Sequence, residues 1–203
     1  MPLPRFTRLP AEEQRRILDV ALQAFAAEGV QTASYNQIIA AAGISRSSAY
    51  NYFDGRDDLL NTVLDDVAER VYAALGAWPG ADDVETFWKQ FFDAAERMSK
   101  HVANNPSDLA LLDMAFIERV RGGYVDWVAA FVETGVRLGL ITIPVERELV
   151  VSATLSMLGT LDGWATERLR AGVMPDPEVF RTVLTPPMGN AFHARVRVLK
   201  PYG

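Results

Sequence analysis

Cysteine is absent from this chain of 203 residues. Without a thiol, the chain can form no disulfide, thiolate metal site or cysteine nucleophile. Histidine is scarce, since only His101 and His193 occur, and neither pairs with a carboxylate at the helical spacing of a metal site. No glycine-rich phosphate loop and no nucleophile elbow is found either. We therefore expect a protein that is not an enzyme and that uses no metal and no cofactor.

Long apolar runs are also missing, since no stretch of about 18 uninterrupted apolar residues occurs. The N-terminus lacks the charged and then apolar pattern of an export signal. Apolar residues nevertheless make up 49% of the chain, enough for a substantial hydrophobic core. These features predict a folded, cytoplasmic protein of one or two domains that does not associate with a membrane.

An excess of positive charge is lacking too, because the formal net charge is −6. Residues 1–58 contain six arginines, no lysine and seven acidic residues, a balance of −1. Nucleic-acid-binding domains are usually basic, so weak, shallowly salt-dependent non-specific binding is expected here. Arg15 and Arg16 are expected to be solvated surface residues. The arginines in this part of the chain are Arg5, Arg8, Arg15, Arg16, Arg46 and Arg56.

No segment alternates in the manner of a β-strand, whereas apolar residues recur at helical spacing along the chain. Glycine and proline divide this pattern into separate helices. We therefore expect an all-α fold in which Pro186-Pro187 breaks the last helical stretch. Apart from the two short helices discussed next, the expected helices are 10–28, 56–75, 83–103, 107–120, 124–138, 145–171, 178–184 and 189–199.

Residues 34–53 carry the most specific local pattern, which is that of two short helices joined by a tight turn. Ser34 and Gln37 have the spacing of a capping box at the start of the first helix. Gly43 permits the left-handed backbone that ends this helix, and Ser45 can cap the second. Such a pair is typical of the helix-turn-helix, whose second helix enters the major groove of DNA.

This segment and its flanks contain a longer set of motifs between about Arg8 and Leu64. The motifs are Ile17-Leu18-Asp19-Val20-Ala21, Phe25, Glu28-Gly29, Ala41-Ala42-Gly43-Ile44-Ser45, Tyr50-x-Tyr52-Phe53 and Arg56-x-x-Leu59-Leu60. Together they resemble the TetR family of bacterial transcriptional regulators. The resemblance implies an N-terminal three-helix, helix-turn-helix DNA-binding domain, residues 1–56. A larger C-terminal helical domain for ligand binding and dimerisation, residues 57–203, is implied after it.

Two positions at the predicted crossing of the short helices depart from the usual pattern of this family. Ile39 stands where the family normally has alanine, and Ala49 stands where a large aliphatic residue is expected. We interpret the pair as a large-for-small exchange that keeps the packed volume nearly constant, which protein cores tolerate well.

The resemblance places the helix from Ser45 to Phe53 in the major groove. Arg46, Ser47 and Asn51 are the candidates for contacts with base edges, and Arg46 is best suited to guanine. A second set is expected to hold phosphates and fix the register. This set comprises Ser34, Ser45, Tyr50, Tyr52 and Arg56, the last in place of a customary lysine.

Residues 145–171 predict a helix that is apolar on nearly every side, and such a helix must be buried on every side. We expect one face to pack inward and the other to meet a second subunit. A stripe of small residues, Ser152, Ser156, Gly159 and Gly163, would let another helix approach closely. The resulting two-fold homodimer would suit a palindromic operator. A helix buried within one subunit is the alternative.

Aromatic residues are concentrated in the C-terminal region, where together they predict a cavity for an apolar or aromatic effector. Taken singly, each is more often a core residue. Asp162 lies mid-helix in an apolar setting and therefore needs a partner or a raised pKa. It could contact the ligand or serve a structural role. The candidate ligand-binding residues are Trp88, Phe91, Phe92, Phe116, Trp127, Phe131, Met157, Leu161, Asp162 and Trp164.

These features predict a ligand-responsive transcriptional repressor that binds double-stranded DNA as a homodimer and is released by a small molecule. An alternative is a helical ligand-binding or interaction module whose helix-turn-helix does not read DNA. The acidic residues Asp54, Asp57 and Asp58, just after the second short helix, favour this alternative.

Overall fold

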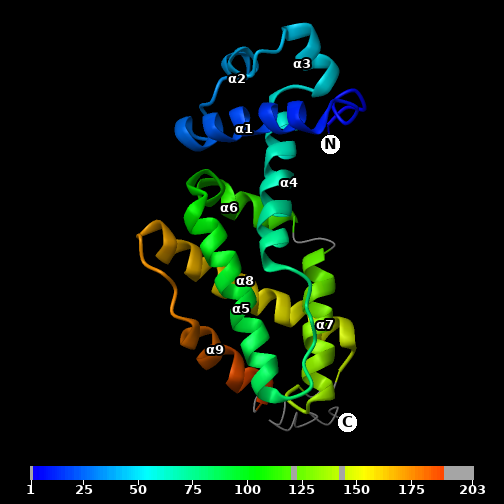
Figure 1. Cartoon of the computed structure of the whole chain (residues 1–203), viewed down its shortest axis with the longest axis vertical. Coiled ribbons are helices and arrows are strands. Elements are labelled where there is room, and N and C mark those ends of the chain that lie inside the picture. The colour runs from blue at the N-terminus through cyan, green and yellow to red at the C-terminus, as the bar shows by residue number, and fades with distance from the viewer. Residues whose placement is uncertain (1, 120–122, 142–144, 190–203) are drawn as a thin grey trace, which may run out of the picture. The chain divides into compact units, whose positions relative to one another are not determined.

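The computed structural model describes residues 2–119, 123–141 and 145–189. Every regular element in these ranges is an α-helix, which confirms the predicted all-α fold (Figure 1). No helix in the same ranges is both long enough and apolar enough to cross a membrane. The helices are α1 (Ala11–Glu28), α2 (Tyr35–Ala41), α3 (Arg46–Tyr52), α4 (Arg56–Leu75), α5 (Val84–Asn104), α6 (Pro106–Arg119), α7 (Gly123–Arg137), α8 (Arg147–Arg170) and α9 (Pro177–Gly189).

Packing divides the chain into two compact units. The first unit comprises residues 1–74 and 100–120, and the second comprises residues 75–99 and 121–203. The first unit therefore contains all of α1, α2 and α3, together with α6. The boundary predicted at residues 56/57 divides a DNA-binding part from an effector-binding part, which is a division by function and not by packing. It stays a prediction.

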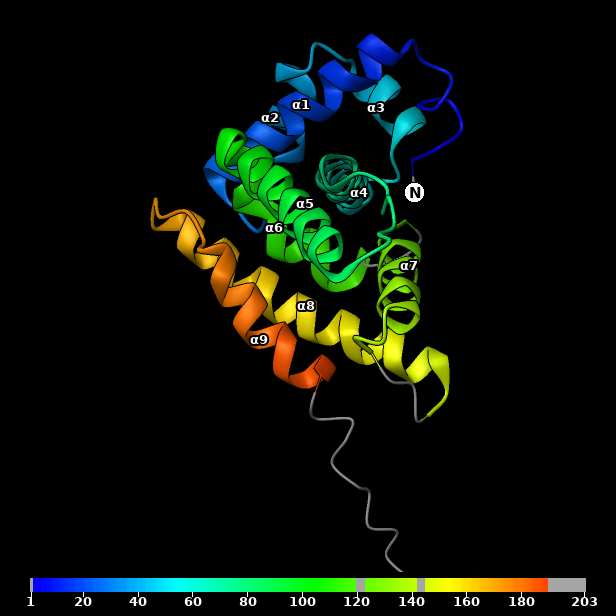
Figure 2. The same cartoon turned by 60° about the horizontal axis from the view of Figure 1, so that its bottom comes forward.

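In the first unit, α1 supplies the apolar stripe that its sequence predicts. The buried residues of α1 are Ile17, Leu18, Ala21, Leu22 and Phe25. Helix α1 packs against α2 and α6, and α2 in turn contacts α3. Both views show α2 and α3 lying close to α1 (Figures 1 and 2). Helices α2 and α3 have seven residues each, and helices this short are not stable in isolation. They are therefore supported by packing with a longer helix.

In the second unit, aromatic rings dominate the core. Phe87 and Phe131 are both fully buried, with ring centroids 4.7 Å apart. Trp127 stacks on Phe131 at 5.7 Å, and Trp78 meets Trp127 edge-on at 5.1 Å. Helix α7 supplies Trp127 and Phe131 to this core and also packs against α8.

One predicted helix boundary is wrong, because α9 continues through Pro186-Pro187 to Gly189. Proline has a φ angle compatible with helical geometry but no backbone N–H, so the helix continues here without the backbone hydrogen bonds that residues 186 and 187 would otherwise donate. The helix predicted for residues 189–199 lies almost entirely outside the described residues.

Candidate functional site

The turn between α2 and α3 has the geometry of a helix-turn-helix. Gly43 has a φ of +66°, which confirms that it adopts the left-handed conformation. Ser45 occupies the N-cap of α3, where its hydroxyl accepts a hydrogen bond from the backbone N–H of Ser48 at 3.1 Å. The predicted capping box of α2 is wrong, since Ser34 occupies the N-cap position but its side chain makes no capping hydrogen bond.

The outward face of α3 carries polar side chains, as the sequence predicts. Arg46, Ser47 and Asn51 are exposed, and Tyr50 is 63% exposed, the largest fraction among the big apolar and aromatic side chains described. Ala49, on the side opposite Ser47 and Asn51, is fully buried. The helix therefore presents one polar face to solvent while its other face anchors it.

Some of these polar groups already have partners within α3. The amide nitrogen of Asn51 donates to the backbone oxygen of Ser47 at 2.8 Å, and the hydroxyls of Ser47 and Ser45 lie 3.0 Å apart. Arg46 makes no side-chain hydrogen bond or ion pair within the described part of the chain. The guanidinium of Arg46 is thus the group on this face that is most available to an external partner.

The tyrosines of α3 differ in their surroundings. The ring of Tyr50 lies 6.1 Å from that of Tyr35 but stays exposed. Tyr52 is half-buried and meets the ring of Phe6 edge-on at 6.3 Å. Ser34 is half-buried, ahead of α2. The phosphate-contacting roles predicted for Ser34, Ser45, Tyr50 and Tyr52 stay predictions.

Arg56 has a structural partner set that the sequence does not reveal. Its Nε donates to the backbone oxygen of Ala33 at 3.0 Å, and its Nη2 donates to that of Val30. The guanidinium also lies over the Phe25 ring, 5.5 Å from the centroid. These contacts fasten the loop between α1 and α2 to the start of α4. The predicted phosphate contact would compete with them.

Arg15 and Arg16 lie on the surface of α1, each with a side chain 48% exposed, as expected. Both also have protein partners. Arg15 contacts a carboxylate oxygen of Asp66 at 2.9 Å, and Arg16 donates to the backbone oxygen of Ala42. Neither guanidinium is therefore a readily available anion-binding group.

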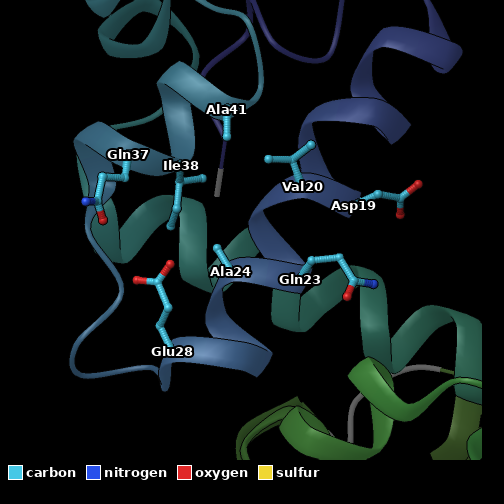
Figure 3. Close-up of a pocket in the computed structure, with 8 residues that line it drawn as sticks. All are labelled: Asp19, Val20, Gln23, Ala24, Glu28, Gln37, Ile38 and Ala41. Carbon is cyan, nitrogen blue, oxygen red and sulfur yellow. The ribbon is translucent and has the colours of Figure 1, made fainter.

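An open groove of about 560 Å³ runs between α1 and α2 (Figure 3). Val20, Ile38 and Ala41 point into the space between the two helices. The exposed carboxylates of Asp19 and Glu28 also line the groove, and no basic residue does. Because these carboxylates repel phosphate, the groove does not extend the candidate DNA-binding face.

A second, much smaller cavity lies inside the second unit. Its volume is about 20 Å³, enough for a single water molecule. Three predicted ligand-binding residues line it: Phe91, Trp127 and Asp162. The sequence reasoning missed six further lining residues, namely Leu75, Ala95, Met98, Tyr124, Leu158 and Phe180.

The other predicted ligand-binding residues whose side chains are described do not line this cavity. Phe131 is part of the aromatic core, and Leu161 is buried. Trp88, Phe92, Met157 and Trp164 are half-buried elsewhere in the unit. The side chain of Phe116 lies outside the described residues. A helical aromatic pattern thus identifies the buried face but not the cavity within it.

Two polar groups face the apolar walls of the cavity. Tyr124 donates a hydrogen bond from its hydroxyl to a carboxylate oxygen of Asp162 at 3.1 Å. Burial raises the pKa of Asp162 from its usual 3.8 to about 7, although the hydrogen bond from Tyr124 opposes this shift. Asp162 therefore has both a partner and a raised pKa. The indole N–H of Trp127 is buried and has no hydrogen-bond partner among the described residues.

This pKa makes the stability of the protein depend on pH. The folded state retains a proton on Asp162 that the unfolded chain loses, so the free energy of unfolding should fall as pH rises from about 4 to about 7. Asp162→Asn has no such proton and serves as the reference. We expect urea unfolding at several pH values to show the wild type losing stability relative to the variant. A constant difference across the range would contradict this assignment.

The structure brings no three histidine or acidic side chains together as a metal site within the described residues.

A family model described as bacterial regulatory proteins, tetR family, matches residues 17–63. This match covers most of α1, all of α2 and α3, and the first part of α4. It therefore covers the helix-turn-helix described above.

Curated relatives match about a third of the chain. The HTH-type transcriptional regulator SrpR of Pseudomonas putida is 43% identical over 63 residues, which are 30% of this chain and 30% of that protein. The HTH-type transcriptional regulator AcrR of Shigella flexneri is 39% identical over 62 residues, 30% of this chain and 29% of that protein. The similarity thus spans less than a third of the length of each relative.

Solved structures resemble nearly the whole chain. The fatty acid degradation regulator FadR of Bacillus halodurans has a TM-score of 0.66 and 18% identity, over 90% of this chain and 97% of that one. FadR of Bacillus subtilis, solved in complex with stearoyl-CoA, has a TM-score of 0.61 and 16% identity, over 86% and 97% of the two chains. At this level of identity, the likeness establishes the fold alone.

Proposed function

Since the chain belongs to the TetR family of bacterial transcriptional regulators, we propose that it represses transcription by binding a palindromic operator as a homodimer, released by a small-molecule effector. The observation that carries this proposal is the exposed polar face of α3, which has the available guanidinium of Arg46 at its start. A gel shift against the DNA upstream of its own gene tests it. Failure to bind would favour the alternative of an interaction module that does not read DNA.

In this proposal, each subunit inserts α3 into the major groove. Arg46 can donate two hydrogen bonds to O6 and N7 of a guanine. Asn51 can read an adenine only after its amide rotates away from the backbone oxygen of Ser47. Phosphate contacts from the flanking residues would then fix the register of the helix on the duplex.

Arg46→Ala should weaken operator binding by about 1–3 kcal/mol and relax specificity at one position in each half-site. The reason is the loss of a two-point contact with a single base. Fluorescence anisotropy with operators carrying each base at each position measures both effects. If binding instead weakens equally for every sequence, Arg46 contacts a phosphate and the base-reading role is wrong.

We propose that α8 forms the subunit interface, together with α9. The inward side of α8 is closed by buried residues such as Val150, Leu158 and Leu161. The predicted stripe of small residues on the opposite side is exposed throughout: Ser152, Ser156, Gly159 and Gly163. A Cβ atom added to either glycine would meet no atom within 4 Å, so these positions have room for a second helix.

Gly163→Arg should prevent this association, because a long charged side chain would occupy the space needed by the partner helix. We expect light scattering to show dimers for the wild type and monomers for the variant. Gly123→Arg is a matched control, since Gly123 is also exposed and helical and a Cβ atom there would also meet nothing. A wild-type monomer that still binds operator tightly would contradict the interface.

We further propose that the effector enters the cavity of the second unit. Its apolar and aromatic walls suit an apolar or aromatic molecule, and the indole N–H of Trp127 and the carboxyl of Asp162 could fix its orientation. Because the cavity holds about 20 Å³, walls such as Met98 would have to move to admit a ligand. Ligand and operator must then favour different conformations for binding to be coupled.

This role requires no catalytic step, and we propose that the protein acts in the cytoplasm without catalysing a reaction. Support comes from the curated relatives, which carry the names of transcriptional regulators. An effector screen that measures operator release, rather than turnover, is the corresponding functional assay.

A further inference from the structure

The N-terminal segment, residues 2–9, is fastened to the end of α3 (Figures 1 and 2). The backbone N–H of Leu3 donates to the backbone oxygen of Tyr52 at 2.8 Å. Phe6 is only 2% exposed, and its ring centroid lies 4.8 Å from that of Phe53. The segment is therefore part of the helix-turn-helix unit and not a free tail.

Two arginines project from this fastened segment. Arg5 and Arg8 are both exposed, on either side of the buried Phe6. The segment turns back on itself, with hydrogen bonds from the N–H of Phe6 to Leu3 and from the N–H of Leu9 to Phe6. Neither arginine has a side-chain partner within the described part of the chain. Both guanidinium groups are thus held in solvent next to the end of α3.

Most other arginines of the first unit whose side chains are described already have protein partners. These pairs are Arg15 with Asp66, Arg16 with the backbone oxygen of Ala42, Arg56 with that of Ala33, and Arg70 with Asp108. Among the described side chains of the first unit, the guanidinium groups available to an external anion are therefore those of Arg5, Arg8 and Arg46. Non-specific affinity for DNA comes almost entirely from positive groups that neutralise phosphates.

We propose that Arg5 and Arg8 bind DNA phosphates beside the groove that α3 enters. The inference rests on the proposed operator binding, and it adds a binding site formed by the N-terminal segment. It also explains how a unit with a charge balance of −1 over residues 1–58 can bind a polyanion. The positive charges are concentrated where the recognition helix meets the duplex, while Arg15, Arg16, Arg56 and Arg70 serve the fold.

The test is the salt dependence of operator binding by the full chain. Anisotropy titrations from about 50 to about 200 mM KCl give the slope of log K against log salt, which is about −0.9 per neutralised phosphate. For a dimer, Arg5→Gln or Arg8→Gln should each reduce the magnitude of this slope by about two, and the double variant by about four. The affinity for operators with altered bases should fall by the same factor as that for the best operator.

A matched control removes two exposed positive charges elsewhere. Arg15→Gln/Lys89→Gln causes the same change in net charge, but Arg15 is paired with Asp66 and Lys89 with Asp93. We expect its slope to remain that of the wild type. Thermal melting followed by circular dichroism checks that every variant is folded.

Three outcomes would count against the proposal in distinguishable ways. An unchanged slope in the double variant, with wild-type binding intact, would overturn the phosphate contacts and leave operator binding standing. A loss restricted to one base position would mean that the arginines read a base, which also overturns the proposal. A wild type that binds no operator at any salt concentration would overturn the proposed function itself.

Discussion

Arg70→Met is expected to lower the free energy of unfolding by about 3–5 kcal/mol, because it leaves a buried carboxylate without its main partner. The side chain of Asp108 is 3% exposed, and its two oxygens accept from Arg70 at 2.6 and 3.3 Å. Arg70 also pairs with Asp66 on the preceding turn of α4. After the substitution, His101 at 3.1 Å would be the remaining partner of Asp108.

Urea unfolding measures this loss, and two further variants identify its cause. Arg15→Met removes a half-exposed arginine from the same network and should cost less than about 1 kcal/mol. Adding Asp108→Asn to Arg70→Met removes the orphaned charge and should recover part of the stability. A loss below about 1 kcal/mol for Arg70→Met alone would show that this network does not stabilise the first unit.

Ile39→Ala should destabilise the protein by about 2–5 kcal/mol, because it opens a cavity where α2 packs. Ile39 is 2% exposed, and Ala49 of α3 is fully buried, so both have the burial that the proposed volume exchange requires. A loss well under 1 kcal/mol on urea unfolding would contradict the packing role of Ile39.

A double-mutant cycle tests the exchange itself. Ala49→Leu alone should overpack the crossing at a cost of about 1–3 kcal/mol. If the two side chains share one volume, Ile39→Ala/Ala49→Leu should be more stable than the sum of the single effects predicts. Additive effects would show that Ile39 and Ala49 occupy independent sites. Ile39→Val, with an expected loss of about 0.5–1.5 kcal/mol, is the conservative control.

Local signals in the sequence were sufficient to predict the fold of the helix-turn-helix. The apolar periodicity of residues 56–75 matches the bounds of α4, and Gly43 ends α2 in the left-handed conformation. The exposure of Ser47 and Asn51 follows from their positions opposite Ala49 on a short helix, and Arg46 is exposed at the first position of that helix. Each of these features depends on residues that are close together in the chain.

Features that depend on tertiary contacts were not predictable in this way. The partners of Arg56 are the backbone oxygens of Ala33 and Val30, more than twenty residues away in the chain. Every residue has a backbone oxygen, so the sequence does not show which of them Arg56 contacts. The cavity was equally unpredictable, because Tyr124 contacts Asp162 only where α7 packs against α8. Periodicity shows which face of a helix is buried, but not which helix covers it.

The position of the N-terminal segment could be predicted only in part from the sequence. Phe6, an aromatic residue between Arg5 and Arg8, was a signal that the segment could be anchored. Its partners, Tyr52 and Phe53, belong to a motif that the sequence assigns to the recognition helix. Both arginines are evident in the sequence, but only the structure shows that most other arginines of the first unit already have protein partners.

Methylation interference on a selected operator tests most directly whether α3 reads the major groove. Methylation of guanine N7 blocks the major-groove contact expected of Arg46. We predict that it prevents wild-type binding at one guanine in each half-site, with the two guanines related by two-fold symmetry and the half-site centres about 34 Å apart. Arg46→Ala should be insensitive to the same methylation. Interference without this symmetry, or equal interference for both proteins, would contradict the account.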